Sequence, residues 1–406
     1  MMKTPKSLRL HIGIFGKTNV GKSSFLNAIT NQNTSIVSDI AGTTTDIVEK
    51  SMELFPIGPV TFLDTAGIDD STEIGELRLS KTFNIIPRCD IAIIVMDFNG
   101  ISDYEINLID KFKKYNIPFI VLINKYDINQ ISSTQYNKIL EYTNNIIETS
   151  SINDKQIINK LIEGLVNIIP DEFINPKSIL GDKVEPSDTV ILVTPIDKEA
   201  PKGRLIMPQV QTIRDLLDND CLAYVVQENR LEQAINNLKE KPKLVVTDSQ
   251  AFRTVDKIVP KDIAITSFSI LFARLKGDLN SFINGCKAIE LLKPNDRVLI
   301  LESCSHHTIE DDIAREKIPK LLKQKLGFDL DFDYKSGHDF PPISRYKLII
   351  HCGACMTNRK EILSRILIAN KKNIPITNYG IVISYCLGIL DRALKIFNEN
   401  AKKVEG

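Results

Sequence analysis

A glycine-rich loop near the N-terminus constrains this chain more than any other feature. The run GKTNVGKS, residues 16–23, follows an apolar stretch at 10–15 and leads into an amphipathic stretch at 23–29. The first stretch is typical of a buried strand and the second of a helix. Glycine lets the backbone N–H groups of such a loop turn toward phosphate oxygens, and the helix N-terminus adds the positive end of its dipole. We therefore predict a strand–loop–helix unit that binds a nucleotide phosphate.

Side chains of this loop are of the types that hold a magnesium nucleotide. Lys22 is placed to neutralise the β and γ phosphates, and the hydroxyl of Ser23 is placed to bind Mg²⁺. The loop residues expected to contact the nucleotide are Gly16, Asn19, Val20, Gly21, Lys22, Ser23 and Ser24.

Two later motifs extend the predicted phosphate site. An apolar strand at 60–63 ends in DTAG, where Asp64 is placed to hold Mg²⁺ through water and the N–H of Gly67 can contact the γ-phosphate. The earlier run GTTTD supplies Thr43 as a nucleotide contact and Thr44 to complete the magnesium shell. The predicted catalytic residues are Lys22, Thr44, Asp64 and Gly67.

The motif NKYD at 124–127, which follows an apolar strand at 119–123, predicts which base is bound. A carboxylate at Asp127 can accept hydrogen bonds from the N1–H and the 2-amino group of guanine, whereas adenine offers no matching donors. We therefore predict GTP as the nucleotide. The expected base pocket consists of Asn124, Lys125 and Asp127, closed by Ser150 and Ser151.

The order of these motifs resembles that of the translation-factor-class GTPases, and residues 9–170 are similar to their TrmE–Era–EngA branch. The resemblance implies GTP hydrolysis, and it implies that Asn19 helps to bind K⁺ beside the phosphates through its side-chain carbonyl. Ile68 follows Gly67, where Ras-like enzymes have a Gln that orients water. Hydrolysis is therefore expected to be slow and to rely on K⁺ and on ordering of residues 36–48.

Length and pattern predict further domains beyond residue 170. A chain of 406 residues exceeds one typical core, and residues 171–187 contain proline and glycine among polar residues, as a linker does. Predicted strands lie at 91–96, 190–193, 221–226, 243–246, 263–266, 297–301 and 346–350. Predicted helices lie at 104–115, 154–169, 210–218, 230–239, 269–284, 287–292, 309–326, 360–370 and 380–396. This alternation predicts an α/β chain with mostly parallel sheets.

Composition restricts the kinds of partner. Lys and Arg total 51 and Asp and Glu total 51, so the formal net charge is zero and charge-driven binding of nucleic acid by the whole chain is not expected. The longest apolar runs have strand length, so no membrane span is predicted. Seven cysteines are too sparse for a disulfide scaffold, which favours a reducing cytoplasm.

A second group of chemically active side chains follows two predicted strands of the last third of the chain. Cys304 and His306 come after the strand at 297–301, and His351, Cys352 and Cys355 come after the strand at 346–350. The residues alone are compatible with an iron–sulfur cluster, with zinc in Cys₃His coordination, or with a thiol–disulfide pair. The spacing does not separate the first two. The other four cysteines, Cys89, Cys221, Cys286 and Cys386, are expected to be packing residues.

A GTPase domain joined to this Cys/His pattern resembles the HydF family of [FeFe]-hydrogenase maturation GTPases over the whole chain. The resemblance implies a GTPase domain at 1–170, a linker at 171–187, a dimerisation domain at 188–266 and an iron–sulfur domain at 267–406. It implies that Cys304, Cys352 and Cys355 hold a [4Fe–4S] cluster with one exchangeable iron ligand, and His306 and His351 are possible further ligands.

The same resemblance implies a scaffold or carrier that forms a homodimer and works with two radical-SAM maturases and the apo-hydrogenase. GTP hydrolysis would then be a conformational control. Two alternatives stay open: an RNA- or ribosome-associated GTPase with a structural zinc domain, and a redox protein that uses Cys352 and Cys355 with GTP as regulator. Zero net charge and the lack of a dense Lys/Arg run in residues 180–406 weigh against the first of these alternatives.

Overall fold

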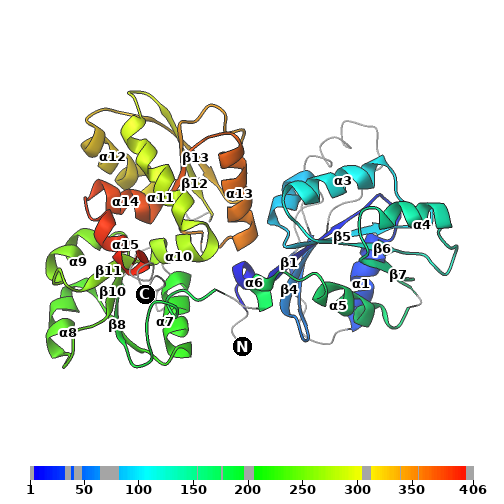
Figure 1. The fold of residues 1–406 in the computed structure, drawn as a ribbon, viewed down its shortest axis with the longest axis horizontal. Helices are drawn as coiled ribbons and strands as arrows, with labels where there is room; N and C mark the ends of the chain where they lie inside the picture. The colour runs from blue at the N-terminus through cyan, green and yellow to red at the C-terminus, as the bar shows by residue number, and fades with distance from the viewer. Residues whose placement is uncertain are drawn as a thin grey trace, which may run out of the picture. The chain divides into compact units, whose positions relative to one another are not determined.

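The chain folds into two units, Met1–Pro176 and Lys177–Gly406 (Figure 1). The computed structural model describes residues 4–32, 38–40, 48–64, 82–152, 154–174, 177–195, 205–303, 312–338, 340–354 and 356–398. No helix within these ranges is long and apolar enough to cross a bilayer.

The first unit is built on a seven-stranded sheet with the order β2-β3-β4-β1-β5-β6-β7. Its strands are β1 (Leu10–Phe15), β2 (Ser38–Ile40), β3 (Val48–Leu54), β4 (Gly58–Asp64), β5 (Ile91–Met96), β6 (Phe119–Ile123) and β7 (Ile146–Glu148). The pairs β2–β3 and β3–β4 are antiparallel and the other pairs are parallel. The nucleotide motifs at 16–23 and 124–127 therefore emerge at the same, carboxyl edge of the sheet.

Helices cover both faces of this sheet, as its apolar strands require. They are α1 (Lys22–Gln32), α3 (Asp103–Lys114), α4 (Ser133–Leu140), α5 (Ile157–Val166) and the short α6 (Asp171–Ile174), with 3₁₀ turns at Lys6–Leu8 and Ile86–Arg88. Ile12 and Ile14 of β1 pack in a core with α1 and α5, whereas Phe15 packs in the opposite core with α3 and α4. This burial on both faces explains why β1 and β5 contain no exposed residue.

The second unit contains two four-stranded parallel sheets. The middle sheet has the order β11-β10-β8-β9 and consists of β8 (Thr189–Val193), β9 (Leu222–Val226), β10 (Leu244–Thr247) and β11 (Ala264–Ser267). The last sheet has the order β13-β12-β14-β15 and consists of β12 (Arg297–Glu302), β13 (Asp331–Ser336), β14 (Leu348–His351) and β15 (Ile376–Asn378). The predicted α/β class with parallel sheets is confirmed.

The helices of this unit bind the two sheets together. They are α7 (Met207–Asp218), α8 (Leu231–Asn237), α9 (Phe252–Ile258), α10 (Phe268–Lys276), α11 (Leu279–Lys287), α12 (Ile318–Leu326), α13 (Arg359–Lys371), α14 (Tyr379–Cys386) and α15 (Leu390–Asn398). Further 3₁₀ turns lie at Glu228–Arg230 and Ala288–Leu291, and a π-helical turn lies at Ile313–Lys317. One core cluster contains Val245 of the middle sheet and Ile300 of the last sheet, so the two domains share buried apolar surface.

Several domain and helix boundaries in the structure differ from those predicted from the sequence. Leu180 and Val184, in the predicted linker, are buried in the core of the middle sheet, together with Phe268 of α10. The middle domain therefore begins before residue 188 and extends beyond 266.

The predicted helix at 269–284 is two helices, because the side chain of Asp278 accepts a hydrogen bond from the N–H of Ser281 and so caps the start of a new helix, α11. The predicted helix at 380–396 is likewise interrupted, at Gly388, which has a φ of +72°.

Candidate functional site

The phosphate loop lies between β1 and α1 and is pressed against two neighbouring segments. Gly16 has a φ of +144°, and a Cβ atom there would lie 2.1 Å from the carbonyl oxygen of Val95. Gly21 has a φ of +97°, and a Cβ atom there would lie 2.1 Å from Nδ2 of Asn124. Both positions therefore require glycine for conformation and for space.

The Lys22 ammonium lies across this loop. The side chain is 6% exposed, and its Nζ donates to the carbonyl oxygens of Gly16 at 2.8 Å and of Lys17 at 2.5 Å. Ser23 and Ser24 are exposed at the first turn of α1, and Asn19 is exposed in the loop with a φ of +61°. The loop thus combines the Lys22 ammonium, the exposed serine hydroxyls and the N-terminus of α1, and this combination suits a phosphate group.

Asn124 joins the phosphate loop to the base motif. Its Nδ2 donates to the carbonyl oxygen of Val20 at 2.9 Å. Its Oδ1 accepts from the backbone N–H of Ser151 at 2.9 Å and from the Ser151 hydroxyl at 2.8 Å. One buried amide therefore connects its own base motif to the phosphate loop, 104 residues before it, and to Ser151, 27 residues after it. Lys125 follows with a φ of +61°, and Asp127 is exposed at the same edge of the sheet.

Asp64, at the end of β4, supplies a carboxylate next to this loop. Its Oδ1 is buried without a hydrogen-bond partner within the described residues. Burial raises the pKa of Asp64 to about 6, although the positive charges of Lys22 and Lys50 oppose the rise. A buried carboxylate oxygen of this kind fits a bound divalent cation, which would satisfy it. Thr43, Thr44, Gly67 and Ile68 lie outside the described residues.

The two segments of the Cys/His pattern meet at the carboxyl edge of the last sheet. Their strands, β12 and β14, are parallel neighbours with Leu301 opposite His351. The Sγ of Cys352 accepts from the backbone N–H of Ser303 at 3.1 Å and lies 3.3 Å from the Ser303 hydroxyl. Ser303 directly precedes Cys304 in the sequence. The structure therefore brings Ser303 to Cys352, while Cys304, His306 and Cys355 lie outside the described residues.

Cys352 has the surroundings of a thiolate ligand. In addition to the Ser303 N–H, its Sγ accepts from the N–H of Ala354 at 3.4 Å, where a φ of +56° at Ala354 turns the chain back. Cys352 thus presents its sulfur to two backbone N–H groups at the carboxyl edge of the last sheet.

His351 is placed differently from the sequence-based suggestion that it ligates the cluster. It is 1% exposed, its Nδ1 lies 2.9 Å from the carbonyl oxygen of Cys352, and its Nε2 lies 2.8 Å from Nη1 of Arg365. A carbonyl only accepts and a guanidinium only donates, so Nδ1 carries the proton and Nε2 accepts. Burial, with the nearby Arg365 charge, lowers the pKa of His351 to about 3. Both ring nitrogens therefore have hydrogen-bond partners among the described residues.

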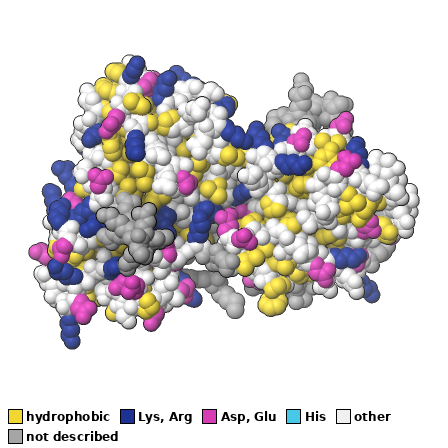
Figure 2. All heavy atoms as spheres, in the orientation of Figure 1, with side chains coloured by type: hydrophobic (Ala, Val, Ile, Leu, Met, Phe, Trp, Pro, Cys, Tyr) yellow, Lys and Arg dark blue, Asp and Glu magenta, His cyan; other side chains and the backbone are white. Residues whose placement is uncertain are grey.

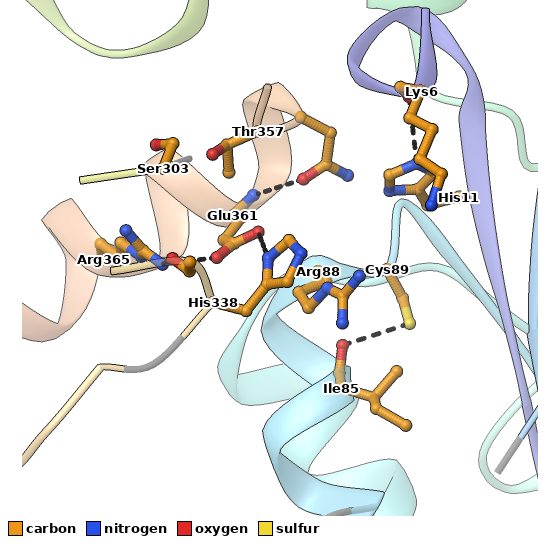
Figure 3. Close-up of polar contacts among 12 residues, drawn as sticks. Lys6, His11, Ile85, Arg88, Cys89, Ser303, His338, Thr357, Glu361 and Arg365 are labelled. Atoms are coloured by element: carbon orange, nitrogen blue, oxygen red, sulfur yellow. Dashed lines mark hydrogen bonds and ion pairs between the residues drawn. The ribbon is translucent and has the colours of Figure 1, made fainter. Parts of the chain in front are cut away.

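Behind His351 lies a buried ion pair, shown in Figure 3. Glu361 and Arg365 of α13 are 3% and 2% exposed, and Nη2 of Arg365 donates to Oε1 of Glu361 at 2.6 Å. The other oxygen, Oε2, lies 2.9 Å from Nδ1 of His338. The chain from His338 through Glu361 and Arg365 to His351 ends at the carbonyl of Cys352. Of these four residues, sequence reasoning found only His351, since nothing local marks Glu361 or Arg365.

The remaining cysteines behave as predicted. Cys89, Cys221 and Cys286 are buried and Cys386 is half-buried, and none of the four forms a disulfide within the described residues. Burial raises the pKa of Cys286 to about 12 and that of Cys386 to about 11, so both stay protonated at neutral pH. They are packing residues.

Comparison with known proteins assigns a class to the first unit. A family model described as 50S ribosome-binding GTPase matches residues 11–125. The tRNA modification GTPase MnmE of Mesoplasma florum is 43% identical over 143 residues, which cover 35% of this chain and 30% of MnmE. GTPase Der of Nitratiruptor sp. is 37% identical over 130 residues, which cover 31% of this chain and 28% of Der. The chain thus spans under a third of the length of these curated relatives.

With the motifs joined by Asn124, these matches define a P-loop GTPase of the TrmE–Der–Era type. The second unit identifies the family. Models described as the hydrogen maturase F dimerization domain and the hydrogen maturase F tetramerization domain match residues 179–277 and 280–396, more than half of the chain together. The chain belongs to the hydrogen maturase F (HydF) family, as the sequence resemblance indicated.

The base pocket yields a prediction for Asp127. Replacing Asp127 by Asn should lower the affinity for GTP and raise that for xanthosine triphosphate, because the amide presents a donor where guanine needs an acceptor. The preference for GTP should fall by roughly 100-fold or more, measured by competition with a fluorescent guanine nucleotide. Asn129→Ala, in the same exposed loop, is the matched control and should bind GTP as the wild type does. Unchanged GTP affinity in the Asp127 variant would refute the base assignment.

Proposed function

We propose that this chain is a GTP-hydrolysing scaffold that binds a [4Fe–4S] cluster and assembles or delivers the two-iron precursor of the [FeFe]-hydrogenase active site. The observation that carries the proposal is the contact of Ser303 with Cys352, because it joins the two Cys/His segments at one sheet edge in a chain of the HydF family. The tRNA and ribosome named for the GTPase relatives belong to those proteins, and an RNA-acting role is not proposed.

In the GTPase unit, the chain binds and positions the nucleotide. Lys22 and the N–H groups of the loop hold the β and γ phosphates, Asp127 reads guanine, and Gly67 contacts the γ-phosphate. Mg²⁺, held by Ser23, Thr44 and Asp64, supplies charge neutralisation when it is bound. Support comes from the unpartnered Oδ1 of Asp64 beside Lys22. Hydrolysis is slow because the position after Gly67 is Ile68, which cannot orient water.

In the last domain, Cys304, Cys352 and Cys355 provide three thiolates for the cluster, whose remaining iron accepts an exchangeable external ligand. We assign His351 a supporting role, because its ring nitrogens bind Arg365 and the Cys352 carbonyl. His306 remains a candidate for the fourth position. The proposed partners are the two radical-SAM maturases and the apo-hydrogenase, and the proposed compartment is the cytoplasm. On the face shown in Figure 2, Lys and Arg are interspersed with Asp and Glu, unlike a polyanion-binding surface.

The free edge of the middle sheet suits pairing with a second copy. β9 is the edge strand, and its apolar residues Leu222, Tyr224 and Val225 are exposed, Leu222 by 61%. Exposed apolar edge strands are templates for strand addition. We therefore place the dimer contact of the matched dimerisation domain at β9.

A charge on this edge tests the dimer contact. Val225→Lys should reduce the mass in solution by half, because a lysine on an edge strand opposes pairing. Multi-angle light scattering measures this mass. Val210→Lys, at an exposed valine of α7, is the matched control and should keep the wild-type mass. If both variants have the wild-type mass, the contact lies elsewhere.

Anaerobic reconstitution tests the cluster proposal. The wild-type chain should become brown, with iron and sulfide in the equal proportions of a cubane. Cys352→Ala should abolish most of the bound iron while GTP turnover stays within about twofold of wild type, because the two sites lie in different units. Cys386→Ala, a packing cysteine, should retain its iron. A colourless protein with stoichiometric zinc would overturn the proposal.

Exchange of the monovalent cation tests Asn19. If its side-chain carbonyl binds K⁺ beside the phosphates, replacing K⁺ by Na⁺ at constant ionic strength should slow GTP turnover about tenfold. Asn19→Ala should turn over GTP equally slowly in both salts. Equal wild-type rates in K⁺ and Na⁺ would remove the cation from the proposal.

A further inference from the structure

Helix α10, which closes the matched dimerisation domain, is shared by the two domains of the second unit. Phe268 and Leu271 are buried in the core of the middle sheet, and Ile270 is buried in the core shared with the last sheet. Nη1 of Arg274 donates to Asp182 at 2.9 Å and to the carbonyl of Ile179 at 3.2 Å, which fixes α10 to the start of the middle domain. The helix therefore cannot move independently of that domain.

Two side chains, Ser269 of α10 and Asn378, link the N-terminal end of α10 to Cys352. The hydroxyl of Ser269 donates to Oδ1 of Asn378 at 3.0 Å, and Nδ2 of Asn378 donates to the carbonyl of Cys352 at 3.2 Å. A Cβ atom on Gly353 would lie 3.7 Å from the Ser269 hydroxyl oxygen, so α10 lies directly against the Cys-x-x-Cys loop.

The C-terminal end of α10 reaches the other side of this loop. Lys276 is 3% exposed, and its Nζ donates to the carbonyl of Ala354 at 2.9 Å and to the carbonyl of Thr357 at 2.8 Å. These two carbonyls lie on either side of Cys355 in the sequence. In return, Nη1 of Arg359 donates to the carbonyl of Leu275 at 2.5 Å and of Gly277 at 3.2 Å, at the end of α10. Hydrogen bonds thus run from a side chain of the helix to the loop, and from a side chain that follows the loop back to the helix.

A buried ammonium is costly unless it is hydrogen-bonded and lies near negative charge. Two carbonyls supply the hydrogen bonds at Lys276. The proposed cluster, if held by three thiolates, would supply the negative charge, and in a buried site that attraction is screened less than at a surface. The reduction potential of an iron–sulfur cluster depends on nearby charge and on hydrogen bonding of its ligands. The position of Lys276 therefore affects both the loop geometry and the electrostatics of the cluster.

We propose that Lys276 is a positioning residue, which fixes the backbone on both sides of Cys355 and holds a positive charge beside the cluster. Through it, α10 connects the oligomerising middle domain to the cluster loop. The charge part of this inference rests on the proposed cluster, whereas the loop part does not.

Lys276→Met in the full chain tests the inference, since it keeps the side-chain length and removes the charge and the donors. In the metal-free protein, amide exchange of peptides covering 352–358 should be about tenfold faster than in wild type. Lys287→Met, at the exposed last residue of α11, is the matched control and should exchange as wild type does. After reconstitution, the Lys276→Met cluster should have a more negative reduction potential, because a nearby positive charge favours the reduced form.

Lys276→Gln separates the two effects and remains informative if the Met variant does not fold. Its amide still donates, so loop exchange should lie between those of wild type and Met, while the potential should still shift to more negative values. Wild-type exchange in the folded Lys276 variants overturns the positioning role. An unchanged potential with a loosened loop overturns the charge role. If the wild type binds no cluster, the function proposed above fails, and the exchange comparison still decides the loop role.

Discussion

Parallel pairing of neighbouring strands is the constraint on which both candidate sites depend. In a parallel pair, the loops that follow the two strands emerge at the same edge of the sheet. β1 and β6, on either side of β5, bring residue 20 to Asn124, and β12 beside β14 brings Ser303 to Cys352. Antiparallel pairing of β12 with β14 would place the two Cys/His segments at opposite edges. The strand polarity thus determines which distant motifs can act together.

Close approach of backbone is the second requirement of the nucleotide site. At Gly16 and Gly21 a Cβ atom would overlap the Val95 carbonyl and the Asn124 amide. The loop can therefore lie directly on the sheet edge, where its N–H groups and Lys22 converge. The same contact lets Asn124 connect the phosphate and base halves of the pocket, so that the fold of the loop and the recognition of guanine depend on each other.

Buried charged side chains lie around the Cys-x-x-Cys loop. Lys276, Glu361 and Arg365 are almost fully buried; Lys276 donates directly to the loop, and Glu361 and Arg365 are linked to the Cys352 carbonyl through His351. Buried ion pairs stabilise a fold weakly, because desolvation offsets much of their attraction. Their concentration behind the Cys-x-x-Cys loop is therefore better explained by the demand for a fixed ligand geometry than by stability.

The sequence by itself determined the phosphate loop, the guanine motif and the parallel α/β class, because each depends on local pattern and residue chemistry. It predicted a linker at residues that are buried in the core of the middle sheet, missed the half-buried edge strand β13, and joined α10 and α11 into one helix, because burial by distant segments leaves no local signal. It suggested His351 as a ligand. Only the tertiary structure placed Nε2 of His351 against Arg365 and Lys276 against the loop from 78 residues away, since such contacts exist only after separate elements pack together.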